Sequence, residues 1–181
     1  MREDYVNGID HINRSLYRNW LNHKGRQLKT SFLRKTGDYA QAEALINESL
    51  LMDKFNMGCR FESYLINTLQ GKSEEAAAAK AEMKALMRGA VHSYLEYAID
   101  YASAGMYDEA AQLLSFVTED AEVTYPMVYF ALGYFASKMG KKDEAVALYK
   151  KAETICPDYC FPNKIEEVLM LNDAMKLNPE G

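Results

Sequence analysis

The sequence predicts an all-α protein, a solenoid of stacked antiparallel helix pairs, and three observations support this fold class. Residues 1–125 contain no proline and are rich in Ala, Leu, Met, Glu and Lys, which favour helices. No segment alternates apolar and polar residues with the period of two that a half-buried strand needs. Glycines recur at spacings of 34, 34 and 35 residues, at Gly37, Gly71, Gly105 and Gly140. A period of this length is typical of solenoids in which each repeat is one structural unit.

Length and composition limit the remaining classes. The 181 residues predict a single domain, 1–181. With 49% hydrophobic and 26% charged residues, the chain is neither disordered nor collagen-like. No apolar run is long enough to cross a membrane, and the charged N-terminus does not have the pattern of a secretory signal. We therefore expect no membrane association and a cytoplasmic location, unless the sequence is a fragment of a longer protein.

The expected elements follow the glycines in order. An N-terminal helix is predicted over residues 2–20, where Tyr5, Ile9, Ile12 and Leu16 fall at helical spacing. Four repeats are predicted over residues 23–56, 57–90, 91–125 and 126–159, followed by a C-terminal helix over 163–177.

Within each repeat the glycine separates the two helices, because glycine tolerates the left-handed backbone that ends a helix. The polar residues Asp38, Ser73, Asp108 and Asp143 are predicted to cap the second helices. In the first repeat, Leu28, Phe32 and Leu33 are predicted to form the buried stripe of the first helix.

The fourth repeat has the clearest pattern. Its first helix carries Tyr129, Leu132, Gly133 and Ala136, and its second carries Ala145, Tyr149 and Ala152 before Pro157. Two alanines seven residues apart with a tyrosine between them predict a narrow helix face that allows close packing.

These residues resemble the signature of the tetratricopeptide repeat (TPR), a helix–turn–helix of 34 residues. The resemblance implies a right-handed superhelix whose first helices line a concave groove for a protein or peptide. The C-terminal half also resembles the TPR region of a large bacterial family of unknown function. Members of that family join an N-terminal mutarotase-like β-sandwich to helical repeats.

The TPR pattern identifies the residues expected to face the groove. They are Phe61, Glu62, Leu65, Leu95, Glu96, Ile99, Phe130, Tyr134, Ser137 and Lys138. Most are aromatic, aliphatic or acidic, which argues against the Lys-, Arg- and Asn-rich clamp that some TPR proteins use for a terminal carboxylate. They suit a peptide anchored by bulky side chains. The other interpretation is that these side chains pack against neighbouring repeats.

No catalytic or metal-binding constellation stands out in the sequence. Cys156 and Cys160 form a C-x3-C pair without further ligands nearby, and the three histidines are scattered. We expect no enzyme activity, no metal and no cofactor. The predicted function is a non-catalytic interaction or scaffold module for a partner protein or peptide. The alternative is an accessory repeat domain of a larger carbohydrate-related bacterial protein, which positions or stabilises a separate domain.

Charge is unevenly distributed along the chain. The formal charge is +3 over residues 1–90 and −8 over 91–181, and no Lys or Arg occurs from Gly89 to Ser137. Two interpretations remain: an acidic surface for a basic partner, or a solvated face with acids near helix starts. Nucleic-acid binding is not expected, because it needs a denser basic stripe. Val168, Leu169 and Leu171 predict apolar exposure on the C-terminal helix and a possible homodimer through that end.

Overall fold

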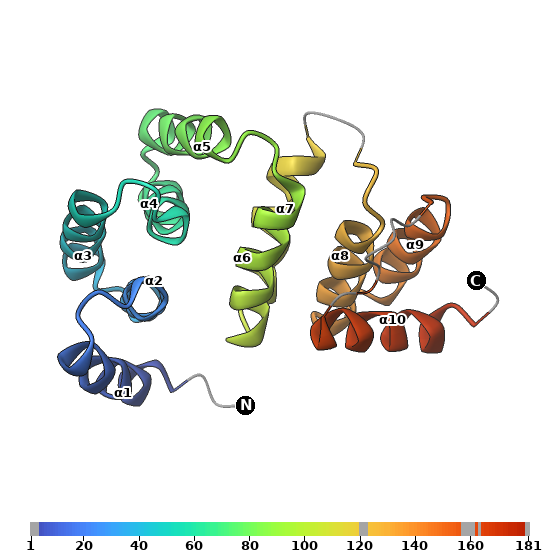
Figure 1. Cartoon of the computed structure of the whole chain (residues 1–181), viewed down its shortest axis with the longest axis horizontal. Coiled ribbons are helices and arrows are strands. Elements are labelled where there is room, and N and C mark those ends of the chain that lie inside the picture. Colours follow the sequence, from blue (N-terminus) through green and yellow to red (C-terminus); the bar gives the residue numbers. More distant parts are fainter. Residues whose placement is uncertain (1–3, 120–122, 157–161, 163, 180–181) are drawn as a thin grey trace. The chain divides into compact units, whose positions relative to one another are not determined.

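The structure is a computed structural model of the whole chain, and it describes residues 4–119, 123–156, 162 and 164–179. Ten α-helices and no strands are found in these ranges (Figure 1), which confirms the all-α prediction. The helices are α1 (Tyr5–Arg18), α2 (His23–Lys35), α3 (Tyr39–Met52), α4 (Met57–Leu69), α5 (Ser73–Met87), α6 (Val91–Ser103), α7 (Tyr107–Thr118), α8 (Met127–Lys138), α9 (Lys142–Glu153) and α10 (Ile165–Leu177).

Each predicted repeat contains one pair of helices. The pairs are α2–α3, α4–α5, α6–α7 and α8–α9, and the two helices of each pair pack together. In each pair a short turn joins the helices, and the glycine identified in the sequence lies in that turn. A turn this short makes the paired helices antiparallel.

The helices form two compact units, and each is described by itself. The N-terminal unit comprises residues 1–88, and the C-terminal unit comprises residues 89–181. In the N-terminal unit α2 packs against α1, α3 and α4; in the C-terminal unit α8 packs against α6, α7, α9 and α10. That residues 1–181 behave as one domain stays a prediction.

The four periodic glycines have the left-handed backbone that the sequence predicts. Their φ angles are 81° at Gly37, 72° at Gly71, 79° at Gly105 and 80° at Gly140. At Gly140 the amide donates to the carbonyl of Ser137 at 3.0 Å, and the Lys141 amide donates to that of Ala136 at 2.9 Å. These bonds satisfy carbonyls at the end of α8 that have no partner within the helix.

Replacing Gly140 by valine tests this backbone requirement. A Cβ built at Gly140 meets no atom within 4 Å, so the expected cost comes from backbone strain alone. We expect a loss of about 1–2 kcal/mol in the free energy of unfolding, measured in urea by circular dichroism. Gly140→Asn is the control and should cost less, because asparagine visits the left-handed region more readily. Equal midpoints for wild type and Gly140→Val would contradict the prediction.

The predicted helix caps are correct at one position of four. Asp38 is the N-cap of α3 and accepts a hydrogen bond from the Gln41 amide at 3.2 Å. Ser73, Asp108 and Asp143 instead lie within the first turn of their helices, after the N-cap residue. The two aspartates still lie where the positive end of the helix dipole favours an acid.

The close approach of α8 and α9 is confirmed. Ala145, Tyr149 and Ala152 are all buried on one side of α9. Gly133 of α8 lies against the Tyr149 ring, so closely that an added Cβ would overlap ring carbons. Glycine at this position thus allows the tyrosine to fill the space between the two helices.

The predicted buried stripe of α2 is only partly correct. Leu33 is buried, but Leu28 and Phe32 are half-buried. Phe32 packs on α1, with its ring centroid 5.2 Å from that of Tyr5. The buried face of α2 is mainly polar and contains Arg26, Gln27, Thr30, Ser31 and Arg34. The reason is that α2 is covered by α1, α3 and α4 together, so faces that would be solvated on a single helix pair are enclosed.

Candidate functional site

The predicted groove residues divide into two groups by accessibility. Six side chains are buried: Phe61, Glu62, Leu65, Leu95, Ile99 and Phe130. Four are half-buried or exposed: Glu96, Tyr134, Ser137 and Lys138. The six buried side chains have little contact with solvent. A ligand could therefore reach the four half-buried or exposed side chains and only the small accessible parts of the other six. Binding by any of these residues stays a prediction.

One cavity in the C-terminal unit brings together two of the predicted residues, Ile99 and Tyr134. It has a volume of about 210 Å³ and receives residues from α6, α7, α8 and α10. Its lining consists of Ile99, Ala102, Ser103, Tyr107, Tyr134, Glu166, Leu169 and Met170. We take this cavity as the candidate site.

The cavity has an apolar interior and a polar rim. Ile99, Ala102 and Met170 are buried, and the Tyr107 and Tyr134 rings meet nearly edge to face, with centroids 6.4 Å apart. Ser103 and Glu166 are exposed. A small apolar depression with a few polar groups at its edge is typical of a binding site for a single bulky side chain.

The repeat pattern does not identify the part of the cavity that α7 and α10 provide. In that pattern the helix of residues 163–177 lies at an end of the solenoid, whereas in the structure α10 packs against α8 and α9 of the same unit. The available signal was the apolar pair Leu169–Met170. Val168 and Leu169 are exposed as predicted, whereas Leu171 is half-buried.

Polar contacts hold α10 in place beside the cavity. Asp173 accepts a hydrogen bond from the Tyr149 hydroxyl at 2.8 Å, and its other oxygen lies 3.6 Å from the Lys138 amine. Burial, and then the hydrogen bond to Asp173, raises the pKa of Tyr149 above its ordinary value. Lys164, just before α10, forms an ion pair with Glu96 of α6. These contacts fix the position of the helix that provides Glu166, Leu169 and Met170.

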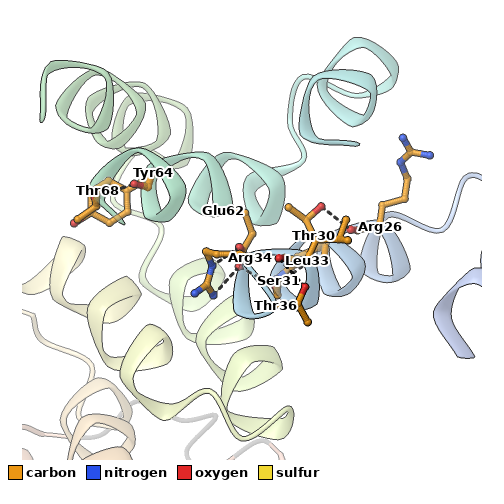
Figure 2. Close-up of polar contacts among 10 residues, drawn as sticks. Arg26, Thr30, Ser31, Leu33, Arg34, Thr36, Glu62, Tyr64 and Thr68 are labelled. Atoms are coloured by element: carbon orange, nitrogen blue, oxygen red, sulfur yellow. Dashed lines mark hydrogen bonds and ion pairs between the residues drawn. The ribbon is translucent and has the colours of Figure 1, made fainter. Parts of the chain in front are cut away.

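Glu62, a predicted groove residue, belongs instead to a buried polar cluster in the N-terminal unit. Figure 2 shows the Arg34 and Ser31 side chains of α2 directed at its carboxylate. Arg34 Nε donates to Glu62 Oε2 at 2.7 Å, and Ser31 Oγ donates to Oε1 at 2.8 Å. Glu62 is completely buried, and so it connects α2 to α4 rather than facing a ligand.

Arg26 is a second buried cation in the same unit. Its Nε donates to Ser49 Oγ at 2.8 Å, and Nη2 lies 3.2 Å from a Glu48 carboxylate oxygen. The Trp20 ring covers the guanidinium, with 4.5 Å between the ring centroid and Cζ. Because Arg26 and Arg34 are both buried, the basic residues of the first repeat do not form a continuous exposed stripe.

Cys59 makes the stability of the N-terminal unit sensitive to alkaline pH. Burial raises the pKa of its thiol to about 11 from an ordinary value of 9.0. Between these two pH values the unfolded chain releases the thiol proton and the folded chain retains it. The free energy of unfolding is therefore unaffected by this thiol below pH 9 and falls as the pH rises from 9.0 to about 11. We expect wild type to lose about 1 kcal/mol more than Cys59→Ala between neutral pH and about pH 10, in urea unfolding followed by Trp20 fluorescence. Parallel losses in the two proteins would contradict this.

The described ranges contain neither a cluster of metal ligands nor a membrane-spanning helix. Those residues contain no group of three or more His, Cys, Asp or Glu that could hold a metal ion. No helix among them is long and apolar enough to cross a bilayer. Cys156 is exposed, while Cys160 and Pro157 lie outside the described residues, so the C-x3-C pair and the predicted helix stop are not described.

Comparison with known proteins places a family match in the C-terminal unit. Residues 128–159, which span α8 and α9, match the model of the tetratricopeptide repeat. No curated protein matches the chain.

Three solved structures illustrate the likeness in fold. A thermophilic TPR protein of Thermus thermophilus is 20% identical, with a TM-score of 0.48 over 95% of this chain and 91% of that one. A TPR protein from Parabacteroides merdae is 17% identical, with a TM-score of 0.49 over 95% and 65%. MamA is 18% identical, with a TM-score of 0.44 over 83% and 88%.

The family match falls on the repeat with the clearest sequence pattern, which confirms the resemblance there. The same α8 that carries Tyr129, Leu132 and Gly133 also supplies Tyr134 to the cavity. The chain is thus an all-α protein of paired helices whose residues 128–159 match the model of the tetratricopeptide repeat.

Proposed function

We propose that this protein is a non-catalytic interaction module that binds a segment of a partner protein at the cavity of the C-terminal unit. The observation that carries the proposal is the accessible, tyrosine-lined cavity beside the tetratricopeptide repeat. Repeats of this type generally act as protein-interaction scaffolds, which supports a protein ligand. The proposed mechanism needs no chemical step, only complementary shape and burial of apolar surface.

The surface beside the cavity supports the same proposal. Ile165, Val168 and Leu169 of α10 are exposed by 78%, 45% and 53%, respectively. Their spacing of three and four residues places them on one side of the helix. A partner segment would insert one bulky side chain into the cavity, against the Tyr107 and Tyr134 rings, and cover this apolar row. Most of the binding energy would come from these few contacts.

The test compares two exposed leucines in the intact chain. Leu169→Ser changes the edge of the cavity, whereas Leu51→Ser changes an 88% exposed leucine of α3 in the other unit. We expect a purified partner, first captured on wild type, to bind Leu169→Ser at least about tenfold more weakly and Leu51→Ser unchanged. Equal binding to all three proteins would show that the cavity is not the site. Melting midpoints near wild type would verify that both variants are folded.

A homodimer through α10 would use the same apolar residues. Such a dimer would bury Leu169, so Leu169→Ser would weaken it and Leu51→Ser would not. Light scattering over a range of protein concentrations distinguishes the two states. A monomer mass at every concentration would exclude the dimer, and the apolar row of α10 would then remain accessible to another protein.

The accessory-domain alternative rests on the resemblance of the C-terminal half to the repeat region of a larger bacterial family. In that case the apolar row of α10 would contact a domain of the same polypeptide. A longer open reading frame around this sequence, together with wild-type capture that Leu169→Ser does not change, would favour the alternative.

A further inference from the structure

The charges around the cavity indicate which side chain it accepts. We propose that it binds an arginine or lysine of the partner segment, flanked by apolar residues that cover the exposed row of α10. This inference rests on the proposed function, since it names the chemistry of the ligand at the same site.

The lining residues contain one carboxylate and no basic group. Glu166 is exposed at the rim, and it makes no hydrogen bond or ion pair with the described part of the chain. Its charge is therefore available to a ligand. By contrast, Glu96 on α6 is already paired with Lys164.

Nearby cations do not neutralise Glu166. Lys138 is outside the lining and lies 3.6 Å from the carboxylate of Asp173, which compensates its charge. No Lys or Arg occurs from Gly89 to Ser137, the segment that contains α6 and α7, and residues 91–181 carry a formal charge of −8. A cationic segment would therefore approach through a favourable potential.

The aromatic walls favour a cation as well. The negative face of a tyrosine ring attracts ammonium and guanidinium groups. The Lys138 amine lies 4.6 Å from the Tyr134 ring centroid and occupies one face of that ring, so a ligand cation would use the remaining surface of Tyr134 or the Tyr107 ring. The Tyr107 ring is inclined at 76° to the Tyr134 ring and adds a second aromatic surface. A guanidinium between these rings and Glu166 would combine an ion pair with aromatic contacts, and its aliphatic stem would cover Ile99 and Met170.

The test uses the full chain and defined peptides. Fluorescein-labelled peptide mixtures of about eight residues, with Leu, Val and Ala around one fixed central residue, are titrated by anisotropy. The central residue is arginine, its neutral isostere citrulline, or leucine. We expect the arginine mixture to bind wild type about tenfold more tightly than the citrulline mixture, with an advantage that decreases as salt increases.

The matched variants are Glu166→Gln and Glu144→Gln. Glu144 of α9 has an exposed side chain and is not in the lining, so its substitution controls for a general loss of negative charge. Glu166→Gln should weaken arginine binding at least about fivefold while leaving leucine binding nearly unchanged, and Glu144→Gln should change neither.

The outcomes separate this inference from the proposed function. Equal binding of arginine and citrulline mixtures, or equal losses in the two glutamine variants, would overturn the cationic preference. The proposed function would survive either result if the captured partner were still lost in Leu169→Ser. If Leu169→Ser changed neither partner nor peptide binding, the site itself would be wrong and both proposals would fail.

Discussion

Replacing Glu62 by leucine is expected to destabilise the N-terminal unit by about 3–5 kcal/mol, because it removes one partner of a buried ion pair. Glu62 is fully buried and accepts hydrogen bonds from Arg34 and Ser31. The substitution would leave the guanidinium of Arg34 inside the protein without the carboxylate that opposes its charge. Urea unfolding followed by fluorescence of Trp20, the only tryptophan, reports on this unit.

A surface glutamate of the same unit provides the control. Glu43 lies 3.5 Å from Lys72, and both side chains are more than 40% exposed. Glu43→Leu should therefore change stability by no more than about 1 kcal/mol. The double variant Arg34→Met, Glu62→Leu should recover most of the loss, since a buried pair can be replaced by apolar side chains. Similar losses for Glu62→Leu and Glu43→Leu would contradict the structural role of the buried pair.

Replacing Gly133 by alanine is expected to destabilise the C-terminal unit by about 1–3 kcal/mol through overpacking. The new Cβ would lie 2.6 Å from Cδ1 of the Tyr149 ring, which is closer than carbon atoms tolerate. The ring cannot move freely, because Tyr149 is buried and its hydroxyl is bonded to Asp173 of α10. The overpacking must outweigh helix propensity, because alanine favours a helix over glycine by about 1 kcal/mol. Thermal unfolding by circular dichroism measures it.

A double-mutant cycle identifies the cause of that loss. In a Tyr149→Leu background the ring is absent, so Gly133→Ala should cost much less than in the wild-type background. The same cost in both backgrounds, or a higher melting midpoint for Gly133→Ala alone, would show that the contact with Tyr149 is not what requires glycine.

The features that could be predicted from the sequence are local in origin. The turns at Gly37 and Gly140 are predictable because a left-handed residue is a property of a few consecutive residues. The α8–α9 contact is predictable because Gly133 and Tyr149 lie in adjacent helices joined by a short turn. Helix starts could be predicted only to within two residues: Asp38 is the N-cap of α3, whereas Asp143 lies two positions after Lys141, the N-cap of α9.

The candidate site was predictable only in part. Ile99 and Tyr134 were identified from the repeat pattern, and both line the cavity. Tyr107, Glu166 and Met170 were not, because their contribution depends on how α10 packs against α8. The sequence pattern around α10 shows where apolar residues lie but not which helix covers them.

By itself the sequence determined the helix pairs, their turns and the tetratricopeptide pattern of residues 128–159. Only the tertiary structure decided which polar residues are buried and which helices enclose the cavity. The repeat pattern predicts that Glu62 faces the groove, whereas in the structure its carboxylate pairs with Arg34, 28 positions away. A helix pair has the same local sequence requirements whether or not a third helix covers it. Burial, charge pairing and the cavity depend on that third helix, and its position is set by packing between distant parts of the chain.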